Sequence, residues 1–185
     1  VSIIGPSGCG KSTLLNMGSG LAKPSAGIVK VAGEVVNGPN KHVAFMLQKD
    51  LLMPWRTIAQ NIEFGLELRG VAASERQTVS TKLLAQCHLT GFGAHYPHQL
   101  SGGEQQRVSI ARAVAHKPSV LFADEPTANL DNESAKVVMG IFAELHKEGQ
   151  TIIMVTHEEQ YAHMAQMIVR LDDGNIVSIE KTHKR

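Results

Sequence analysis

The sequence predicts an α/β fold with a parallel central sheet, antiparallel β elements and an inserted α-helical subdomain. Three observations support this prediction. The chain opens with an apolar run at residues 1–4, then a glycine-rich turn and then a helical pattern, which is the order strand, loop, helix. Residues 120–123 form a continuous apolar run, as expected of a central strand in a parallel sheet, and residues 151–156 are a second predicted buried strand. Between them and the first strand, helical periodicity from about 57 to 116 interrupts the β/α alternation.

The glycine-rich turn matches a phosphate-binding motif. Gly5, Gly10, Lys11 and Ser12 occupy the fixed positions of G-x-x-x-x-G-K-[ST]. Glycines let successive backbone N–H groups point into one concavity, and the helix that follows adds the positive end of its dipole there. We expect Lys11 to reach the β- and γ-phosphates and the Ser12 hydroxyl to bind Mg²⁺.

A plain glycine-rich turn is the alternative interpretation, and the strand, loop and helix context argues against it. The sequence therefore predicts a P-loop NTPase core. Its expected nucleotide-binding residues are Gly5, Pro6, Ser7, Gly8, Cys9, Gly10, Lys11, Ser12 and Thr13.

Composition favours one globular domain over residues 1–185. The chain has 43% hydrophobic and 19% charged residues, and 18 Lys and Arg against 17 Asp and Glu give a net charge of +1. This balance lacks the basic excess that is typical of nucleic-acid binding, so no nucleic-acid partner is expected. Two cysteines, Cys9 and Cys87, do not make a disulfide framework. Because Val1 already lies in a core strand, we expect the chain to be N-terminally truncated, and any membrane association to pass through a partner.

Apolar periodicity and turn residues predict the remaining elements. Thr57 is the expected N-cap of the helix that starts there, and Gly70 is its expected stop. The expected elements are a helix over 11–18, a hairpin over 28–36, a strand over 42–48, helices over 57–69, 74–88, 132–147 and 158–165, a hairpin of 167–171 with 175–179, and a fraying tail over 180–185.

A loop at 50–56 carries three large apolar residues and the only Trp of the chain, Trp55, around Pro54. Apolar clusters on loops tend to mark partner surfaces. A small local core beneath the loop is the alternative.

A second anion site is predicted at 100–107. Ser101 sits where an N-cap belongs, and Glu104 three residues later completes a capping box. Gly102 and Gly103 in the first helical turn cost roughly 1 kcal/mol each relative to Ala. Close approach of a phosphate to bare backbone amides explains their presence.

Polar residues follow both of these predicted strands. Asp124 and Glu125 come directly after the apolar run at 120–123, and His157 follows the strand at 151–156. We expect Asp124 to lie beside the phosphate-binding loop and to hold Mg²⁺, and Glu125 to accept a proton from an attacking water. A solvated acidic turn is the alternative, as is a purely structural role for the lone His157.

The segment LSGGEQQ at 100–106 resembles the signature motif of ABC-type ATPases, and the motifs here follow that family's order. The resemblance implies a Q-loop glutamine at Gln48, a catalytic glutamate at Glu125 and a switch histidine at His157. It implies Mg²⁺ at Ser12, Gln48 and Asp124, and a D-loop at Leu130-Asp131 with Asp131 as its acidic residue. It also implies that the partner's nucleotide is contacted by Leu100, Ser101, Gly102, Gly103, Glu104 and Gln105.

The same resemblance implies ATP hydrolysis by a head-to-tail dimer, in which the signature helix of one subunit covers the ATP bound by the other. It implies membrane permease subunits as partners, a peripheral place on the cytoplasmic face of the cell membrane, and in importers a solute-binding protein. The loop at 51–55 would border the groove that receives the permease's coupling helix. The family's adenine-stacking residue would lie upstream of Val1.

Two subgroups of the family are each resembled in part. Residues 52–57 with Asn61-Ile62 look like importers of nitrate, sulfonate, taurine or pyrimidine-type solutes, which we favour because this region faces the permease. Residues 122–131 and 154–157 are closer to lipoprotein-releasing and macrolide-export ATPases. A soluble ABC ATPase acting on ribosomes or DNA is a further alternative, and the LSGGEQQ segment argues against a generic P-loop kinase or GTPase.

Overall fold

A computed structural model describes residues 1–182 of the chain. These residues form two compact units. The first unit comprises Val1–Gln48, Pro118–Ala128 and the chain from Gly149 onward, and the second comprises Lys49–Lys117 and Asn129–Glu148. The second unit is wider than the predicted helical subdomain of about 57–116, because it starts at Lys49 and includes one helix from later in the chain.

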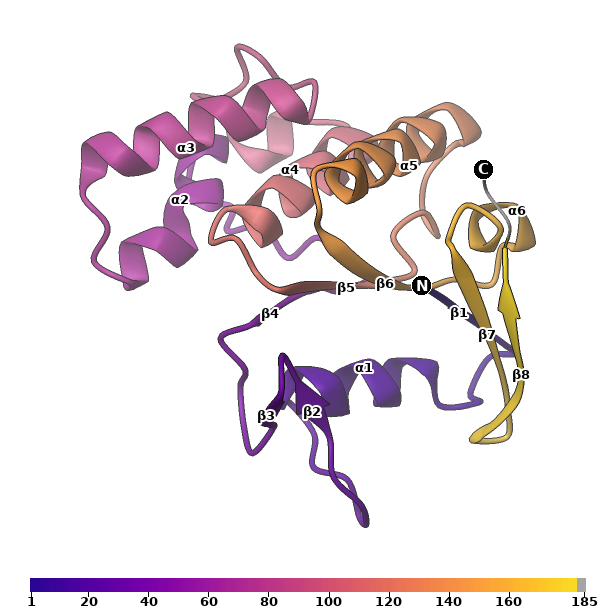
Figure 1. The fold of residues 1–185 in the computed structure, drawn as a ribbon. Coiled ribbons are helices and arrows are strands. Elements are labelled where there is room, and N and C mark those ends of the chain that lie inside the picture. Colours follow the sequence, from indigo (N-terminus) through magenta and orange to yellow (C-terminus); the bar gives the residue numbers. More distant parts are fainter. Residues whose placement is uncertain (183–185) are drawn as a thin grey trace. The chain divides into compact units, whose positions relative to one another are not determined.

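The first unit is built on a mixed sheet of six strands in the order β4-β5-β6-β1-β7-β8 (Figure 1). Its first five strands run parallel, and β8 closes the edge as an antiparallel hairpin with β7. The predicted α/β class is confirmed. The strands are β1 (Ser2–Ile4), β4 (Val43–Met46), β5 (Val120–Asp124), β6 (Thr151–Val155), β7 (Met167–Asp172) and β8 (Asn175–Lys181), and a separate antiparallel pair is made by β2 (Lys30–Val31) and β3 (Glu34–Val35).

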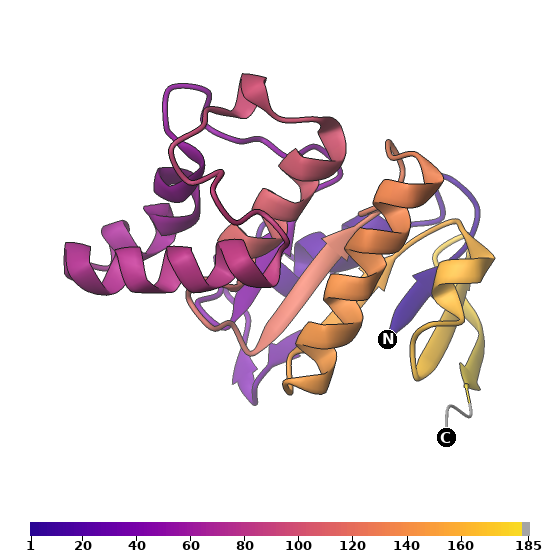
Figure 2. The same cartoon turned by 90° about the horizontal axis from the view of Figure 1, so that it is seen from above.

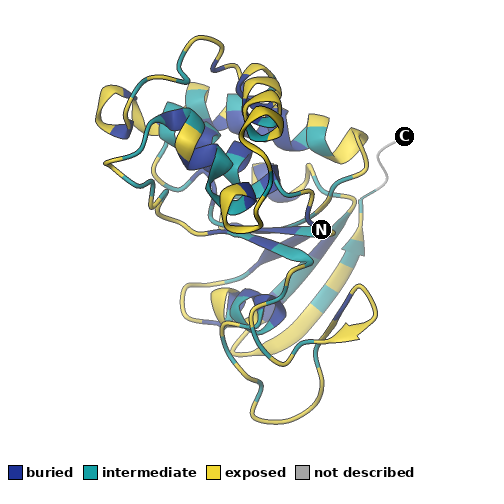
Figure 3. Cartoon of the chain, turned by 90° about the vertical axis from the view of Figure 1, so that its left-hand side faces the viewer, coloured by how far each residue is buried: buried dark blue, intermediate teal, exposed yellow. Residues whose placement is uncertain are grey.

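The core of this unit lies where the helix α1 (Lys11–Ser19) meets the sheet. Leu15 packs in one cluster with Ile3, Phe122 and Val155, and β1 and most of β5 are buried. Figure 3 draws buried residues in dark blue. Gly18 is required here, because a Cβ atom at this position would lie 2.7 Å from the Phe122 ring. The close contact of helix and strand fixes the loop that joins β1 to α1.

The second unit consists of helices. α2 (Ile58–Leu68) contacts both α3 (Ala73–Gln86) and α4 (Gly102–Val114), and α4 also contacts α5 (Asn132–Lys147), as Figures 1 and 2 show. A short 3-10 turn, η1 (Pro97–Gln99), precedes α4. Thr57 caps α2 in a full capping box with Gln60, which confirms the predicted helix start. Among residues 1–182, no helix is long and apolar enough to cross a membrane.

Two predictions near the C-terminus are wrong. The helix expected over 158–165 is only the short α6 (Glu159–Ala162), because the N–H groups of Met164 and Ala165 each bond to the carbonyl three residues earlier, in tight turns that lead into β7. The tail expected to fray from residue 180 instead continues β8 to Lys181. Arg170 on β7 binds the Glu180 carboxylate at 2.7 Å and so holds this end of the strand. The last part of the predicted tail, 183–185, lies outside the described residues.

Candidate nucleotide site

The loop between β1 and α1 has the form that the motif predicts. Gly8 and Gly10 have φ angles of +80° and +102°, in the left-handed region that side chains disfavour. Lys11 is buried, and its Nζ donates hydrogen bonds to the carbonyls of Gly5 at 2.9 Å and Pro6 at 2.8 Å. The ammonium charge is therefore held inside the curve of the loop, where it can meet a phosphate oxygen.

Three predicted residues gather at the carboxyl ends of neighbouring strands. Gln48 follows β4, Glu125 follows β5 and His157 follows β6. Gln48 donates from Nε2 to Glu125 Oε2 at 3.3 Å, and His157 Nδ1 lies 3.4 Å from Glu125 Oε1. Each oxygen of the Glu125 carboxylate thus faces one of the two other side chains.

Glu125 has a backbone conformation that is unusual for its residue type. Its φ angle is +48°, while its N–H donates to the carbonyl of Val155 on β6 at 2.9 Å. A non-glycine residue in this region carries strain on the order of 1 kcal/mol or more, and such strain is concentrated at functional sites. The chain turns sharply directly after β5, and this turn directs the carboxylate toward the ends of β4 and β6.

Asp124 ends β5, and one of its carboxylate oxygens, Oδ1, is buried without a hydrogen-bond partner in the described structure. A buried acceptor without a donor is costly, and it suits a cation or a cation-bound water. Magnesium is a hard ion that takes few protein oxygens and shares phosphate oxygens, so the Asp124 carboxylate, the Ser12 hydroxyl and the Gln48 amide oxygen are donors of the right kind. In residues 1–182 no group of three or more His, Cys, Asp or Glu could hold a metal by itself.

The sheet order places Asp124 one strand away from β1, because β6 lies between β5 and β1. His157, which follows β6, is the residue on the strand adjacent to β1.

The LSGGEQQ segment forms the start of α4 in the second unit, and its predicted capping box is confirmed. Glu104 N donates to Ser101 Oγ at 3.3 Å, and Glu104 Oε2 accepts from both the Ser101 hydroxyl and the Ser101 N–H at 2.7 Å. These hydrogen bonds, led by the one from the Ser101 hydroxyl, lower the pKa of Glu104. Gln105 donates to the carbonyls of Pro97 and Leu100, both at 3.1 Å, and fixes the loop before the helix.

Ser101 and Gly102 are exposed at this helix start, whereas Gly103 is buried. Gly103 faces Ser134 in the first turn of α5, and a Cβ atom on Gly103 would lie 2.6 Å from the Ser134 Oγ. Ser134 in turn donates from Oγ to Asp131 Oδ2 at 2.9 Å, while Asp131 Oδ1 caps α5 by accepting from the N–H groups of Glu133 and Ser134. The bonds from Ser134 lower the pKa of Asp131.

Sequence reasoning missed Ser134, Thr127 and Glu158, which position these groups. Ser134 ties Asp131 to the signature glycines, and its place three residues after an Asp N-cap was the available signal. Thr127 donates to Glu158 at 2.9 Å, and thereby joins the loop that carries Glu125 to the loop that carries His157. Nothing in the local sequence pattern marks that long-range bond.

The β1 strand, its glycine loop and α1 on a parallel sheet define the chain as a P-loop NTPase. Comparison with known proteins narrows this class. Residues 1–128 match the protein family described as ABC transporter. An uncharacterized ABC transporter ATP-binding protein of Methanocaldococcus jannaschii, MJ1508, is 44% identical over 188 residues, which cover 97% of this chain and 84% of that protein.

The macrolide export ATP-binding/permease protein MacB of Bradyrhizobium diazoefficiens is 42% identical over 191 residues, which cover 98% of this chain and 29% of that protein. The solved dimeric structure of the ATP-binding cassette MJ0796 bound to ADP and Pi is similar with a TM-score of 0.87 and 34% identity. That match covers 100% of this chain and 85% of the other. The chain belongs to the ABC transporter family, as an ATP-binding domain of the ATPase type. These relatives do not support the predicted nitrate, sulfonate and taurine type of importer. The exporter alternative is supported by the relative that is described as a macrolide export protein.

Proposed function

We propose that this chain is the ATP-hydrolysing subunit of an ABC exporter, acting as a dimer on the cytoplasmic face of a membrane permease. The observation that carries the hydrolytic part is the Glu125 carboxylate, which stands between Gln48 and His157 at the end of three parallel strands. The proposal that the transporter is an exporter is supported by the similarity to a macrolide export protein. It is also supported by the resemblance of residues 122–131 to lipoprotein-releasing and macrolide-export ATPases.

In this proposal Lys11 and the N–H groups of the phosphate-binding loop hold the phosphates of ATP, as the loop's concave form and buried lysine favour. Ser12, Gln48 and Asp124 would hold Mg²⁺, which when bound neutralises charge on the phosphate oxygens. The unpartnered Asp124 Oδ1 supports its part in this set.

Glu125 acts as the general base. A water hydrogen-bonded to its carboxylate gives up a proton as the water oxygen bonds to the γ-phosphorus, and the bond to the ADP oxygen breaks. Gln48 and His157 approach the two carboxylate oxygens and orient them. In this proposal His157 also senses the γ-phosphate. The hydrogen bond from Thr127 to Glu158 holds the loop that carries Glu125 and the loop that carries His157 together during this step.

Ser101 and Gly102 serve the nucleotide of a second copy in the proposed dimer. Their exposure at the start of a helix supports this assignment, because free N–H groups and the helix dipole at such an end attract phosphate. Asp131 is placed near the same end of the unit by Ser134 and Gly103. The dimeric form of the solved relative is further support.

The loop at 51–55 is the proposed contact with the permease's coupling helix. Leu51 and Trp55 are 61% and 73% exposed, so the alternative of a local core beneath the loop does not account for either side chain.

The substitution E125Q tests the hydrolytic proposal. The amide cannot take a proton, so we expect ATP binding to persist while steady-state turnover falls by about 10²–10⁴-fold and an ATP-dependent dimer accumulates. The matched control is E75Q, an exposed carboxylate in the first turn of α3, which should behave as the unaltered protein. Normal turnover in E125Q would remove Glu125 from the mechanism.

Co-purification from membranes tests the transport proposal. A polytopic permease without a solute-binding protein supports an exporter. A permease that brings a solute-binding protein supports the importer instead, and RNA or DNA in place of a membrane protein would favour the soluble alternative.

A further inference from the structure

The apolar loop of the second unit has an exposed surface on a fixed backbone. Leu51 and Trp55 are largely exposed, whereas the backbone of the loop makes a series of hydrogen bonds to buried side chains. An exposed loop without such bonds would be expected to sample many conformations. The conformation of the loop therefore depends on these backbone hydrogen bonds as well as on the partly buried Leu52 and Met53.

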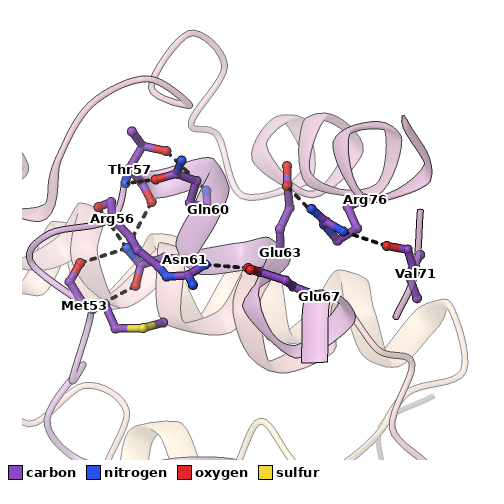
Figure 4. A network of polar contacts seen from close by, with 9 residues as sticks. All are labelled: Met53, Arg56, Thr57, Gln60, Asn61, Glu63, Glu67, Val71 and Arg76. Carbon is purple, nitrogen blue, oxygen red and sulfur yellow. Dashed lines mark hydrogen bonds and ion pairs between the residues drawn. The ribbon is translucent and has the colours of Figure 1, made fainter. Parts of the chain in front are cut away.

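Asn61 on α2 is the first anchor, and it is fully buried. Its Oδ1 accepts from the N–H of Met53 at 2.8 Å, and its Nδ2 lies within 3.0–3.2 Å of three backbone carbonyls, as Figure 4 shows. The three carbonyls belong to Met53, Arg56 and Thr57. One amide side chain thus spans the loop and closes it against the start of α2.

The second anchor comes from α4. Arg112 donates to the carbonyl of Asp50 at 2.5 Å and to that of Leu51 at 2.9 Å, and Ser109 donates to the Asp50 carbonyl at 3.2 Å. Leu51 is held with a φ angle of +43°, which an unrestrained leucine rarely adopts. The loop is thereby fixed at both ends, by Asn61 and by Arg112.

A third contact fixes the residue next to Trp55. Arg56 forms an ion pair with Glu67 at 2.6 Å (Figure 4). Its guanidinium carbon also lies 4.8 Å from the centre of the Phe64 ring. These contacts tie the loop to α2 and α4, whereas the large apolar side chains of Leu51 and Trp55 are exposed.

We propose that Asn61 is a positioning residue that keeps residues 50–56 as a preformed platform for the membrane partner. The identity of the partner as a membrane permease rests on the proposed function. The restraint of the loop by Asn61 does not depend on it. Ordering a flexible segment at the moment of binding lowers affinity, and a loop that is fixed beforehand avoids most of that loss. Loss of Asn61 should therefore reduce the stimulation of hydrolysis by the membrane partner, while ATP binding and basal hydrolysis continue.

Trp55 is the only tryptophan of the chain, so its fluorescence reports on this loop alone. In N61A we expect lower Trp55 anisotropy and stronger quenching by iodide. We also expect the Arg56 N–H, which bonds to the Met53 carbonyl at 3.1 Å, to exchange with solvent at least about tenfold faster, equivalent to ~1.4 kcal/mol. R112K is the second variant, because a lysine cannot reproduce the guanidinium fork on the Asp50 and Leu51 carbonyls.

The matched control is S80A. Ser80 is also almost fully buried, and it bonds to Glu63 on the same helix α2 at 2.6 Å, but it makes no hydrogen bond to the loop. S80A should lower thermal stability without changing Trp55 anisotropy or Arg56 exchange. These measurements use the chain without ATP or a partner, so they can fail independently of E125Q.

Hydrolysis measured with and without the co-purified permease completes the test. The expected result for N61A is unchanged basal turnover and a smaller stimulation by the permease than in S80A. Unchanged Trp55 mobility in both N61A and R112K would refute the claim that Asn61 and Arg112 restrain the loop. A more mobile loop with full stimulation by the permease would refute the claim that the fixed loop serves as a platform for the partner.

Discussion

The close contact between the signature helix and the first turn of α5 gives a prediction with a matched control in the same helical turn. A Cβ atom on Gly103 would lie 2.6 Å from the Ser134 Oγ and 2.8 Å from the Ser134 Cβ, whereas a Cβ atom on Gly102 would have no heavy atom within 4 Å. Alanine in a helix is favoured over glycine by about 1 kcal/mol at most in either place. The two substitutions therefore differ mainly in the contact with Ser134.

Forcing extra volume into a packed contact costs ~1–3 kcal/mol. We expect G102A to leave stability unchanged or slightly higher, and G103A to be less stable than G102A by that amount. For a domain of this size, 1 kcal/mol shifts the melting temperature by about 2–4 °C, so the two melting temperatures should differ by roughly 2–12 °C. Urea unfolding of the two variants side by side gives the same comparison as a free energy.

A double-mutant cycle identifies the contact as the cause. S134G loses the hydrogen bond to Asp131 but makes room for a methyl group on Gly103, so G103A should cost less in the S134G background, by about 1 kcal/mol or more. Equal stabilities for G102A and G103A, or an additive cycle, would refute the conclusion that Ser134 links Asp131 to the signature helix.

Two further predictions concern the nucleotide loop and the capping box. K11A should abolish ATP binding measured by titration, because it removes the only side-chain cation held in the phosphate-binding loop in the described structure; normal affinity would contradict the assignment of that loop. Glu104 has a lowered pKa, so its stabilising effect is complete above its ordinary value of 4.5 and is lost as pH falls through the lower folded value. S101A should lower the free energy of unfolding by ~1 kcal/mol at pH 7. It should also lose less stability than the unaltered protein when the pH falls below about 4.5. Urea unfolding over a pH series measures both effects, and parallel pH curves for the two proteins would contradict the second.

Local sequence signals predicted the parts of the fold that depend on neighbours in the chain. The N-cap at Thr57 and the capping box at Ser101 formed as expected, because each needs only a hydroxyl and groups within three residues of it. The start of α1 after Gly10 and the bounds of α5 at 132–147 follow for the same reason. Helix ends that depend on tertiary contacts did not follow, and α6 is the example, because the approach to β7 converts its expected second half into turns.

Contacts between distant segments were predicted only in part. The strand ends that carry Gln48, Glu125 and His157 could be recognised one by one, but their meeting depends on the sheet order β4-β5-β6, which no local pattern encodes. The same order places β6 between β5, which ends in Asp124, and β1, and no local pattern indicates this arrangement either. The Thr127 and Glu158 pair could not be foreseen at all, since its partners are joined only by the folded sheet.

The structure also explains why residues 52–57 and Asn61 were a poor guide to the transported solute. Met53, Arg56 and Thr57 are tied to Asn61 through their backbone groups, and the Arg56 side chain is tied to Glu67. A buried amide that bonds four backbone groups is selected by the shape of the loop, whatever the solute. Similarity at such positions reports that two proteins share this loop and its mode of restraint. It therefore carries little information on the direction or cargo of transport, whereas the outward-facing Leu51 and Trp55 are the positions where a partner's identity can act.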